Sequence, residues 1–295
     1  MVQTPSHDRD RRSRLSGKST AKIAGDQGMR TVRTLVLAIA ALLAGSWGAS
    51  AQTGDTGFLN RSVVVDGAEY RYQVYVPRDY VRSAASPIIL ALHGGGSYGR
   101  DGLLQTDGGL AHALRQHADR YPAIVVFPQS PPGGTPGFQA LGERIALATL
   151  DKSMAEFGAD PSRVYLTGLS AGGNGAWYLA YHHSDRFAAL VVVCGFVGEF
   201  TGVTSGVRYP AIVPASVSDP FSALAQRVSR LPIWIFHGDA DRTVPVEVSR
   251  RMAASLKAIG ANVQYTELPG VGHNAWDPAY ERADLAAWLF RQQRR

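Results

Sequence analysis

The chain has 295 residues, which is enough for one large or two modest domains, and no Pro- or Ser-rich linker divides it after about residue 60. Its net charge is +6, but residues 1–51 hold eight Lys or Arg against three Asp or Glu, so the remainder is nearly neutral. This distribution argues against a nucleic-acid-binding surface. A single cysteine, Cys194, excludes an intramolecular disulfide, and its place in an apolar run indicates a small core residue.

The amino-terminal segment has the layout of a secretory signal peptide. Two arginines precede the apolar run 35–45, which is too short to span a bilayer comfortably, and the small residues 49–51 follow it. We expect cleavage after Ala51, a mature chain from Gln52, and a secreted or periplasmic protein without a stable membrane anchor. Met29 stands just before the charged segment and is a candidate for the true start. An uncleaved anchor is the alternative.

Beyond the leader, the sequence predicts a mostly parallel sheet. Asp66 and Gly67 separate the runs 61–65 and 68–76, as in an antiparallel hairpin. Apolar runs and helical stretches then alternate, and runs that are apolar on both faces belong to parallel strands covered by helices. We therefore predict an α/β fold with about eight strands in one doubly wound sheet. The strands are expected at 88–92, 123–127, 164–168, 188–194, 232–236 and 263–268, and the helices at 105–120, 139–157, 171–183, 218–229, 246–259 and 279–292.

A serine follows the apolar run 164–168 in a pattern that predicts a nucleophile elbow. Gly168, Ser170 and Gly172 form the pattern Gly-x-Ser-x-Gly, and small residues that tolerate a helix come next. A sharp turn from strand to helix holds a serine hydroxyl away from its surroundings, beside a base. Side chains at the two glycine positions would crowd the crossing of strand and helix. Ser170 is therefore the candidate nucleophile.

Two further residues follow strand ends in the order that this architecture requires of an acid and a base. The run 232–236 leads to Asp239 and Asp241. We assign the acid to Asp241, which lies further into the loop, whereas Asp239 is expected to shape the turn. His273 follows the strand 263–268 on a glycine-rich loop and is the candidate base.

Other histidines receive structural roles. We expect His237, at the end of its strand, to be semi-buried with satisfied hydrogen bonds. His182 and His183 are expected to cap the helix that they end. His93 is expected to anchor its loop.

A glycine run after the strand 88–92 predicts a site that stabilises negative charge on a carbonyl oxygen. Backbone N–H groups that are fixed before the reaction stabilise such an oxyanion by roughly 3–4 kcal/mol per donor. We assign the donors to Ala171 and Gly95, with Gly96 as the alternative to Gly95. No metal or organic cofactor is implied, because no His, Cys or carboxylate cluster has the spacing of a zinc site and the chemistry needs none.

Together these motifs resemble the α/β-hydrolase superfamily, and more narrowly the secreted esterases grouped with polyhydroxybutyrate depolymerases, feruloyl esterases and predicted peptidases. The resemblance covers about residues 60–292 and rests on the segments 72–77, 92–96, 160–170, 237–245 and 272–276. It implies a single catalytic domain at 52–295, a Ser-His-Asp triad and hydrolysis of carboxylic esters through an acyl-enzyme. In the depolymerase and feruloyl branch a cysteine often follows His-Gly in the oxyanion loop. Glycine stands there in this chain, which favours the phospholipase/carboxylesterase-like and predicted-peptidase branch.

Substrate choice is expected to lie in the loops. We expect contacts from Tyr98, Phe196 and Trp276, with Phe200 and Tyr209 as further candidates for an apolar wall. Aromatic residues in such loops pack in the core at least as often. The sequence leaves acetyl, feruloyl and short fatty acyl esters open, on a small-molecule or oligomeric substrate, and it does not indicate an oligomeric state.

Two other functions remain as alternatives. A serine peptidase of the prolyl-oligopeptidase type uses the same triad, but that group usually carries an amino-terminal propeller, and this sequence has no repeats. A secreted hydrolase-fold binding protein without turnover is the second alternative. The complete set of catalytic motifs argues against it.

Overall fold

A computed structural model describes residues 55–202 and 206–294 of the chain. The predicted signal peptide and its cleavage site lie outside these residues, so both stay predictions. All of these residues belong to one compact unit. In the described ranges, none of the helices has the length and apolar character that a membrane crossing requires.

An eight-stranded sheet lies at the centre of the fold, in the order β1-β2-β4-β3-β5-β6-β9-β10. The first two strands form the predicted hairpin, β2 pairs with β4 in the antiparallel sense, and every later pair is parallel. The prediction of about eight mostly parallel strands is confirmed. The strands are β1 (Gly57–Val65), β2 (Ala68–Val76), β3 (Ile88–Leu92), β4 (Ile124–Pro128), β5 (Val164–Leu169), β6 (Ala189–Val193), β9 (Ile233–Gly238) and β10 (Val263–Leu268).

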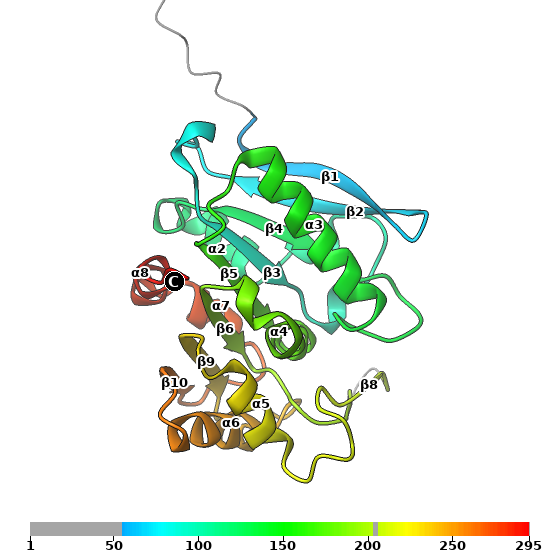
Figure 1. Ribbon diagram of the computed structural model, residues 1–295, viewed down its shortest axis with the longest axis vertical. Coiled ribbons are helices and arrows are strands. Elements are labelled where there is room, and N and C mark those ends of the chain that lie inside the picture. The colour runs from blue at the N-terminus through cyan, green and yellow to red at the C-terminus, as the bar shows by residue number, and fades with distance from the viewer. Residues whose placement is uncertain (1–54, 203–205, 295) are drawn as a thin grey trace, which may run out of the picture. The chain divides into compact units, whose positions relative to one another are not determined.

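Helices cover both faces of this sheet. In β3, Ile88 and Leu90 belong to one buried cluster, whereas Ile89 and Ala91 belong to another on the opposite face. The first cluster includes residues of α3 to α6, and the second includes residues of α2, α7 and α8. Figure 1 shows α3 lying across β2, β4 and β3. The α-helices are α2 (Leu110–Gln116), α3 (Leu141–Phe157), α4 (Ala171–His183), α5 (Pro220–Val228), α6 (Glu247–Ala258), α7 (Trp276–Tyr280) and α8 (Ala283–Phe290).

Short elements complete the fold. A two-stranded antiparallel sheet of β7 and β8, which the sequence did not predict, lies in the connection between β6 and α5. Its strands are β7 (Phe200–Thr201) and β8 (Arg208–Tyr209), and the 3-10 helices are η1 (Arg82–Ala84), η2 (Gly95–Ser97), η3 (Leu104–Thr106), η4 (Ala118–Arg120) and η5 (Ser184–Arg186).

Two predicted helices are interrupted. The helix expected at 105–120 is reduced to α2 between η3 and η4, because Gly109 has a φ of 60° and cannot continue a right-handed helix. A Cβ at Gly109 would also lie 2.5 Å from Cδ2 of Leu169, so the glycine allows close packing there. The helix expected at 279–292 is divided into α7 and α8, which are separated at Arg282, where the backbone is extended.

Candidate active site

The candidate residues follow different strands but lie at the same edge of the sheet. Ser170 follows β5, Asp241 follows β9 and His273 follows β10. The glycine run of the predicted oxyanion loop follows β3, which pairs directly with β5. All four segments are therefore at the carboxyl edge, where ligands bind in parallel sheets.

The turn around Ser170 has the geometry of a nucleophile elbow. Ser170 has a φ of 52° and a ψ of −116°, a backbone conformation that residues other than glycine rarely adopt. The helix α4 follows it directly. Its backbone N–H donates to the carbonyl of Val193 at 2.9 Å. A Cβ at Gly168 would collide with the carbonyl of Gly172, and a Cβ at Gly172 would collide with the carbonyl of Leu92. Backbone sterics therefore require both glycines.

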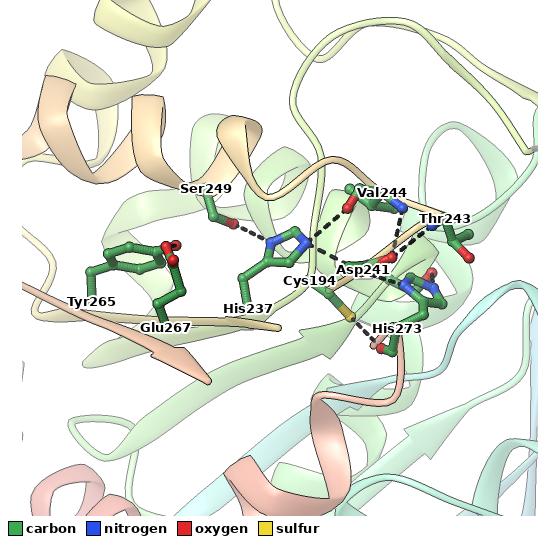
Figure 2. Close-up of polar contacts among 10 residues, drawn as sticks. Cys194, His237, Asp241, Thr243, Val244, Ser249, Tyr265, Glu267 and His273 are labelled. Carbon is green, nitrogen blue, oxygen red and sulfur yellow. Dashed lines mark hydrogen bonds and ion pairs between the residues drawn. The ribbon is translucent and has the colours of Figure 1, made fainter. Parts of the chain in front are cut away.

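Ser170, His273 and Asp241 form a hydrogen-bonded line. Figure 2 shows the contact between His273 and Asp241. Ser170 Oγ lies 2.9 Å from His273 Nε2, and His273 Nδ1 lies 2.7 Å from Asp241 Oδ2. Because an ionised carboxylate only accepts, Nδ1 carries the hydrogen and Nε2 presents its lone pair to the serine hydroxyl. The line thus has the polarity that a general base requires.

Asp241 is a fully buried carboxylate with several donors. Its Oδ1 accepts from the backbone N–H groups of Thr243 and Val244 at 2.8 and 3.0 Å, and its side chain has 0% exposure. Burial alone would raise the pKa of Asp241. Hydrogen bonds from His237, His273 and the two backbone N–H groups outweigh this effect and hold the pKa well below its usual range.

Asp239, the acid that we did not select, has a different role. Its Oδ1 accepts from the backbone N–H of Gly270 at 2.7 Å. It therefore ties the loop after β9 to the loop after β10 and does not contact His273 within the hydrogen bonds of the described residues.

The predicted oxyanion donors line one cavity with Ser170. Ala171 is the first residue of α4 and Gly95 the first of η2, positions where backbone N–H groups have no acceptor within their own helix. A Cβ at Gly95 would lie 3.9 Å from that of Ala171, so the two are neighbours. Gly96 lines the same cavity.

His93 anchors the loop of the predicted oxyanion donors. Its Nε2 accepts from the backbone N–H of Ser130 at 3.0 Å, so Nδ1 carries the hydrogen and donates to the carbonyl of Gly94 at 2.7 Å. Burial lowers the pKa of His93 to about 4, which keeps the ring neutral.

The cavity beside Ser170 has a volume of about 430 Å³, within the usual range for small-molecule sites. Of the three predicted substrate contacts, Phe196 and Trp276 line it, whereas Tyr98 is not among the lining residues. The hydroxyl of Tyr98 instead donates to that of Tyr209 at 2.9 Å, which supports the wall from behind. The residues lining the cavity are His93, Gly94, Gly95, Gly96, Ser97, Gln105, Gly108, Gly109, Leu169, Ser170, Ala171, Phe196, Phe200, Gly202, Tyr209, Thr243, His273 and Trp276.

Gln105 is a lining residue that the sequence did not indicate. Its side chain is nearly buried, its Nε2 donates to the carbonyl of Phe127 at 3.4 Å, and its Oε1 has no hydrogen-bond partner among the described residues. A buried acceptor without a partner favours a ligand that donates a hydrogen bond. No motif in the sequence distinguishes Gln105 from other polar loop residues.

Three other histidines differ from expectation. His237 is fully buried, not semi-buried, and its Nε2 lies 3.2 Å from Asp241 Oδ2. His183 does not cap α4 with its ring: its Nε2 bonds to Glu143 Oε1 at 2.7 Å. The ring of His182 packs against that of Tyr178, with centroids 4.4 Å apart. His183 and His237 bond to Glu143 on α3 and Ser249 on α6, which spacing along the chain does not reveal, whereas Tyr178 lies one turn before His182 on the same helix.

Cys194, Asp241 and His273 are the only group of three among the described residues whose potential metal-ligand atoms lie within 4.8 Å of one another. Burial and the nearby Asp241 raise the pKa of the Cys194 thiol far above its usual range, so the thiol stays protonated. Metals bind the thiolate, and the imidazole and carboxylate are already bonded to each other. The donor chemistry therefore favours a hydrogen-bonded group over a metal centre.

Comparison with known proteins gives a family match over half of the chain. A sequence model described as the prolyl oligopeptidase family matches residues 146–293. This range includes Ser170, Asp241 and His273.

Individual relatives extend the comparison. Acetylxylan esterase A from Emericella nidulans is 28% identical over 251 residues, which are 69% of this chain and 80% of that protein. An uncharacterized secreted protein from Arthroderma benhamiae is 26% identical over 229 residues, or 71% of this chain, but the chain spans only 23% of that relative's length. The crystal structure of a thermostable esterase matches with a TM-score of 0.64 and 28% identity, covering 80% of this chain and 63% of that one. The fold is that of the α/β-hydrolases, and the comparisons support esterase-type chemistry.

Proposed function

The chain belongs to the prolyl oligopeptidase family, and from this premise we propose that it is a secreted serine esterase that hydrolyses carboxylic esters. The observation that carries the proposal is the hydrogen-bonded line from Ser170 Oγ through His273 to Asp241, next to a cavity large enough for a small ester. The esterases among the relatives favour an ester substrate over an amide.

Acylation begins at Ser170. His273 Nε2 removes the hydroxyl proton while Oγ attacks the ester carbonyl carbon, and Asp241 stabilises the imidazolium that forms. The carbonyl oxygen becomes an oxyanion, to which the N–H groups of Ala171 and Gly95 donate. His273 then gives its proton to the alcohol oxygen as the carbon–oxygen bond breaks, which leaves an acyl-Ser170.

Deacylation repeats the sequence with water as the nucleophile. His273 removes a proton from the water, the same two N–H groups hold the second oxyanion, and Ser170 leaves with the proton from His273. Each well-placed donor contributes about 3–4 kcal/mol to the stability of the transition state.

The cavity walls suggest the size of the acyl or alcohol group. Phe196, Phe200 and Tyr209 form an aromatic cluster on one side, with the Phe196 and Phe200 centroids 4.5 Å apart. The ring of Trp276 meets His273 edge-on at 5.4 Å. This enclosure fits a short acyl chain or a single aromatic ring, and the acetylxylan esterase among the relatives makes an acetylated saccharide the first natural substrate to test.

A peptidase is the second candidate, and the family match is the observation that favours it. With the same three residues, Ser170 would attack a peptide carbonyl. A peptidase would differ in its leaving group, which is an amine, and in how the cavity holds the substrate residue that carries the attacked carbonyl. A prolyl p-nitroanilide therefore distinguishes the two candidates.

The test is a set of initial rates on p-nitrophenyl esters from acetyl to palmitoyl, methyl ferulate, acetylated xylan and a prolyl p-nitroanilide. The Ser170→Ala variant provides the blank. We expect turnover of the shorter esters that is lost in the variant. Turnover of the anilide alone would support the peptidase, and a folded protein that hydrolyses none of these substrates would contradict both candidates.

Secretion is a separate part of the proposal. It rests on the basic, apolar and small-residue order of the leader, and the secreted relative supports it. Expression of the full chain in a bacterium should release a protein whose amino terminus, read by mass spectrometry, is Gln52. A cell-bound product that retains residues 35–45 would contradict it.

A further inference from the structure

A second histidine contacts the carboxylate of Asp241 from the side opposite to the candidate base. His237 lies near the end of β9, and its side chain has 0% exposure. Its Nε2 lies 3.0 Å from the carbonyl oxygen of Val244 and 3.2 Å from Asp241 Oδ2, and its Nδ1 lies 2.7 Å from Ser249 Oγ on α6. Figure 2 shows the ring between Ser249 and Asp241.

These partners fix the tautomer of His237. Nε2 faces a carbonyl oxygen and a carboxylate oxygen, which are both acceptors, so Nε2 carries the hydrogen and shares it between them. Nδ1 faces a hydroxyl, which can donate to it. Both ring nitrogens therefore have partners, as a buried polar group requires.

The same hydrogen holds the loop that carries Asp241. The backbone N–H of Val244 donates to Asp241 Oδ1 at 3.0 Å, while its carbonyl accepts from His237. Asp241 Oδ2 accepts from His273 and His237 together. Without His237, Oδ2 would lose a donor and the Val244 carbonyl would lose its side-chain partner, in a place that water does not reach.

We propose that His237 is a positioning residue for the reaction: it holds Asp241 Oδ2 toward His273 and withdraws part of the negative charge from that oxygen. The inference rests on the proposed function, since it assigns a partner to the proposed acid. His237 is not among the residues that line the cavity, so it acts through Asp241 and the loop that carries it.

The charge effect has a definite sign. Removal of the second donor concentrates negative charge on Oδ2, which then holds the imidazolium of His273 more strongly. The rate should therefore fall off at a higher pH on the acid side of the profile. Two other ionisable groups lie close by. Cys194 lies beside Asp241 and His273, and its thiol is protonated. Glu267, the residue of β10 aligned with His237, is held by Arg250 at 2.6 Å and by Tyr265 at 2.6 Å.

The test compares His237→Leu with His237→Gln. Leucine has similar bulk but no donor, whereas the glutamine Nε2 can reach the place of the histidine Nε2 and donate. For the leucine variant we expect kcat to fall about 10-fold or more, because a small displacement of a catalytic group has a large effect on rate. KM should stay within about two-fold. The acid limb, which is the part of the pH–rate profile where the rate falls toward low pH, should move to higher pH. The glutamine variant should recover most of the rate and return the acid limb to its wild-type position.

Two further variants separate positioning from folding. Thr149→Val removes a buried hydrogen bond that has no link to Asp241, and it should lower the thermal midpoint without moving the acid limb. Ser249→Ala removes only the Nδ1 partner, and it should lower kcat less than His237→Leu while moving the limb the same way. Ser249→Ala also tests the inference if His237→Leu fails to fold.

A measurement without turnover separates this inference from the esterase proposal. The His273 Nδ1 hydrogen, bonded to Asp241 at 2.7 Å, should give a downfield proton resonance that shifts in His237→Leu and Ser249→Ala but not in Thr149→Val. An unchanged resonance and acid limb in folded His237→Leu, or equal losses in the leucine and glutamine variants, would overturn the inference. The resonance tests it even if no ester is hydrolysed.

Discussion

The turn that carries Ser170 and the loop that carries Asp241 both follow strands of one sheet, but different forces hold them. At the Ser170 turn the backbone itself sets the geometry, because Gly168 and Gly172 lie where any Cβ would collide with a carbonyl group. At the Asp241 loop, side-chain hydrogen bonds set the geometry, since the carboxylate is held by backbone N–H groups of its own loop and by two histidines.

The two regions should therefore respond differently to substitution. At the elbow, an added side chain would displace backbone that both the fold and the position of Ser170 depend on. A substitution of either glycine should therefore lower the stability as well as the rate. Hydrogen bonds around Asp241 mainly orient one group, so a substitution there should affect the rate more than the fold. Variants at the two regions distinguish these two responses.

Asp241→Asn should have the largest effect on the rate. The amide presents a donor where His273 requires an acceptor, so kcat should fall by about 10⁴-fold with the fold retained. Asp239→Asn is the matched control, and its effect should be less than about 10-fold because the Asp239 carboxylate bonds to the backbone N–H of Gly270 and, within the described residues, not to His273. Initial rates and circular dichroism measure both, and a larger loss in Asp239→Asn would contradict our choice of acid.

Gly172→Ala tests the steric side of the contrast. The added methyl group would meet the carbonyl groups of Leu92 and His93, so we expect the free energy of unfolding to fall by about 3 kcal/mol or more. Gly198→Ala adds the same methyl group in open space and should change stability by less than about 0.5 kcal/mol. Urea titration measures the difference, and equal values for the two variants would refute the steric argument.

Asp241 should also make the free energy of unfolding depend on pH, and this effect should be smaller than the previous two. The pKa of Asp241 is lowered in the folded protein, so its contribution to stability is complete above its unfolded value of about 3.9 and is lost as the pH falls below it. The free energy of unfolding should therefore fall more steeply below pH ~4 in the wild type than in Asp241→Asn. Parallel slopes in urea titrations at several pH values would show that Asp241 has an ordinary pKa.

Trp276→Ala should have the smallest effect on chemistry. Its ring lines the cavity and packs against His273, so its loss should change the preference among acyl chains more than the rate on the acetyl ester. Ratios of kcat/KM along the p-nitrophenyl series measure this. An unchanged ratio would remove Trp276 from the substrate wall.

The contrast also explains what the sequence could predict. The parallel strands inside the sheet follow from apolar runs, and β3 has the predicted bounds because burial on both faces leaves a clear local pattern. The edge strand β10 is only partly buried, and the alternation of its residues predicts its bounds. The elbow is similarly local, since its glycines and serine lie within five residues. Asp241 and His273 could be selected because their order along the chain and their places after strands are part of the architecture.

Other features depend on contacts that a local sequence pattern does not show. The role of His237 depends on Ser249 in the next helix and on the curvature of the loop to Val244, and a His-Gly pair at a strand end does not encode either. The break before α2 comes at Gly109, where the close approach of Leu169 leaves no room for a Cβ. The position of Tyr98 near the predicted oxyanion loop suggests a substrate contact, but Tyr98 bonds to Tyr209 and is not among the residues that line the cavity.

The most direct test of the central claim is covalent labelling with a p-nitrophenyl alkylphosphonate, which reacts with an activated serine and mimics the oxyanion. Intact mass and peptide mapping would follow the reaction. Our account predicts one adduct per chain, located on Ser170, with no labelling of Ser170→Ala and slow labelling of Asp241→Asn. A folded, ester-hydrolysing protein that stays unlabelled at Ser170, or that carries the adduct on another residue, would contradict it.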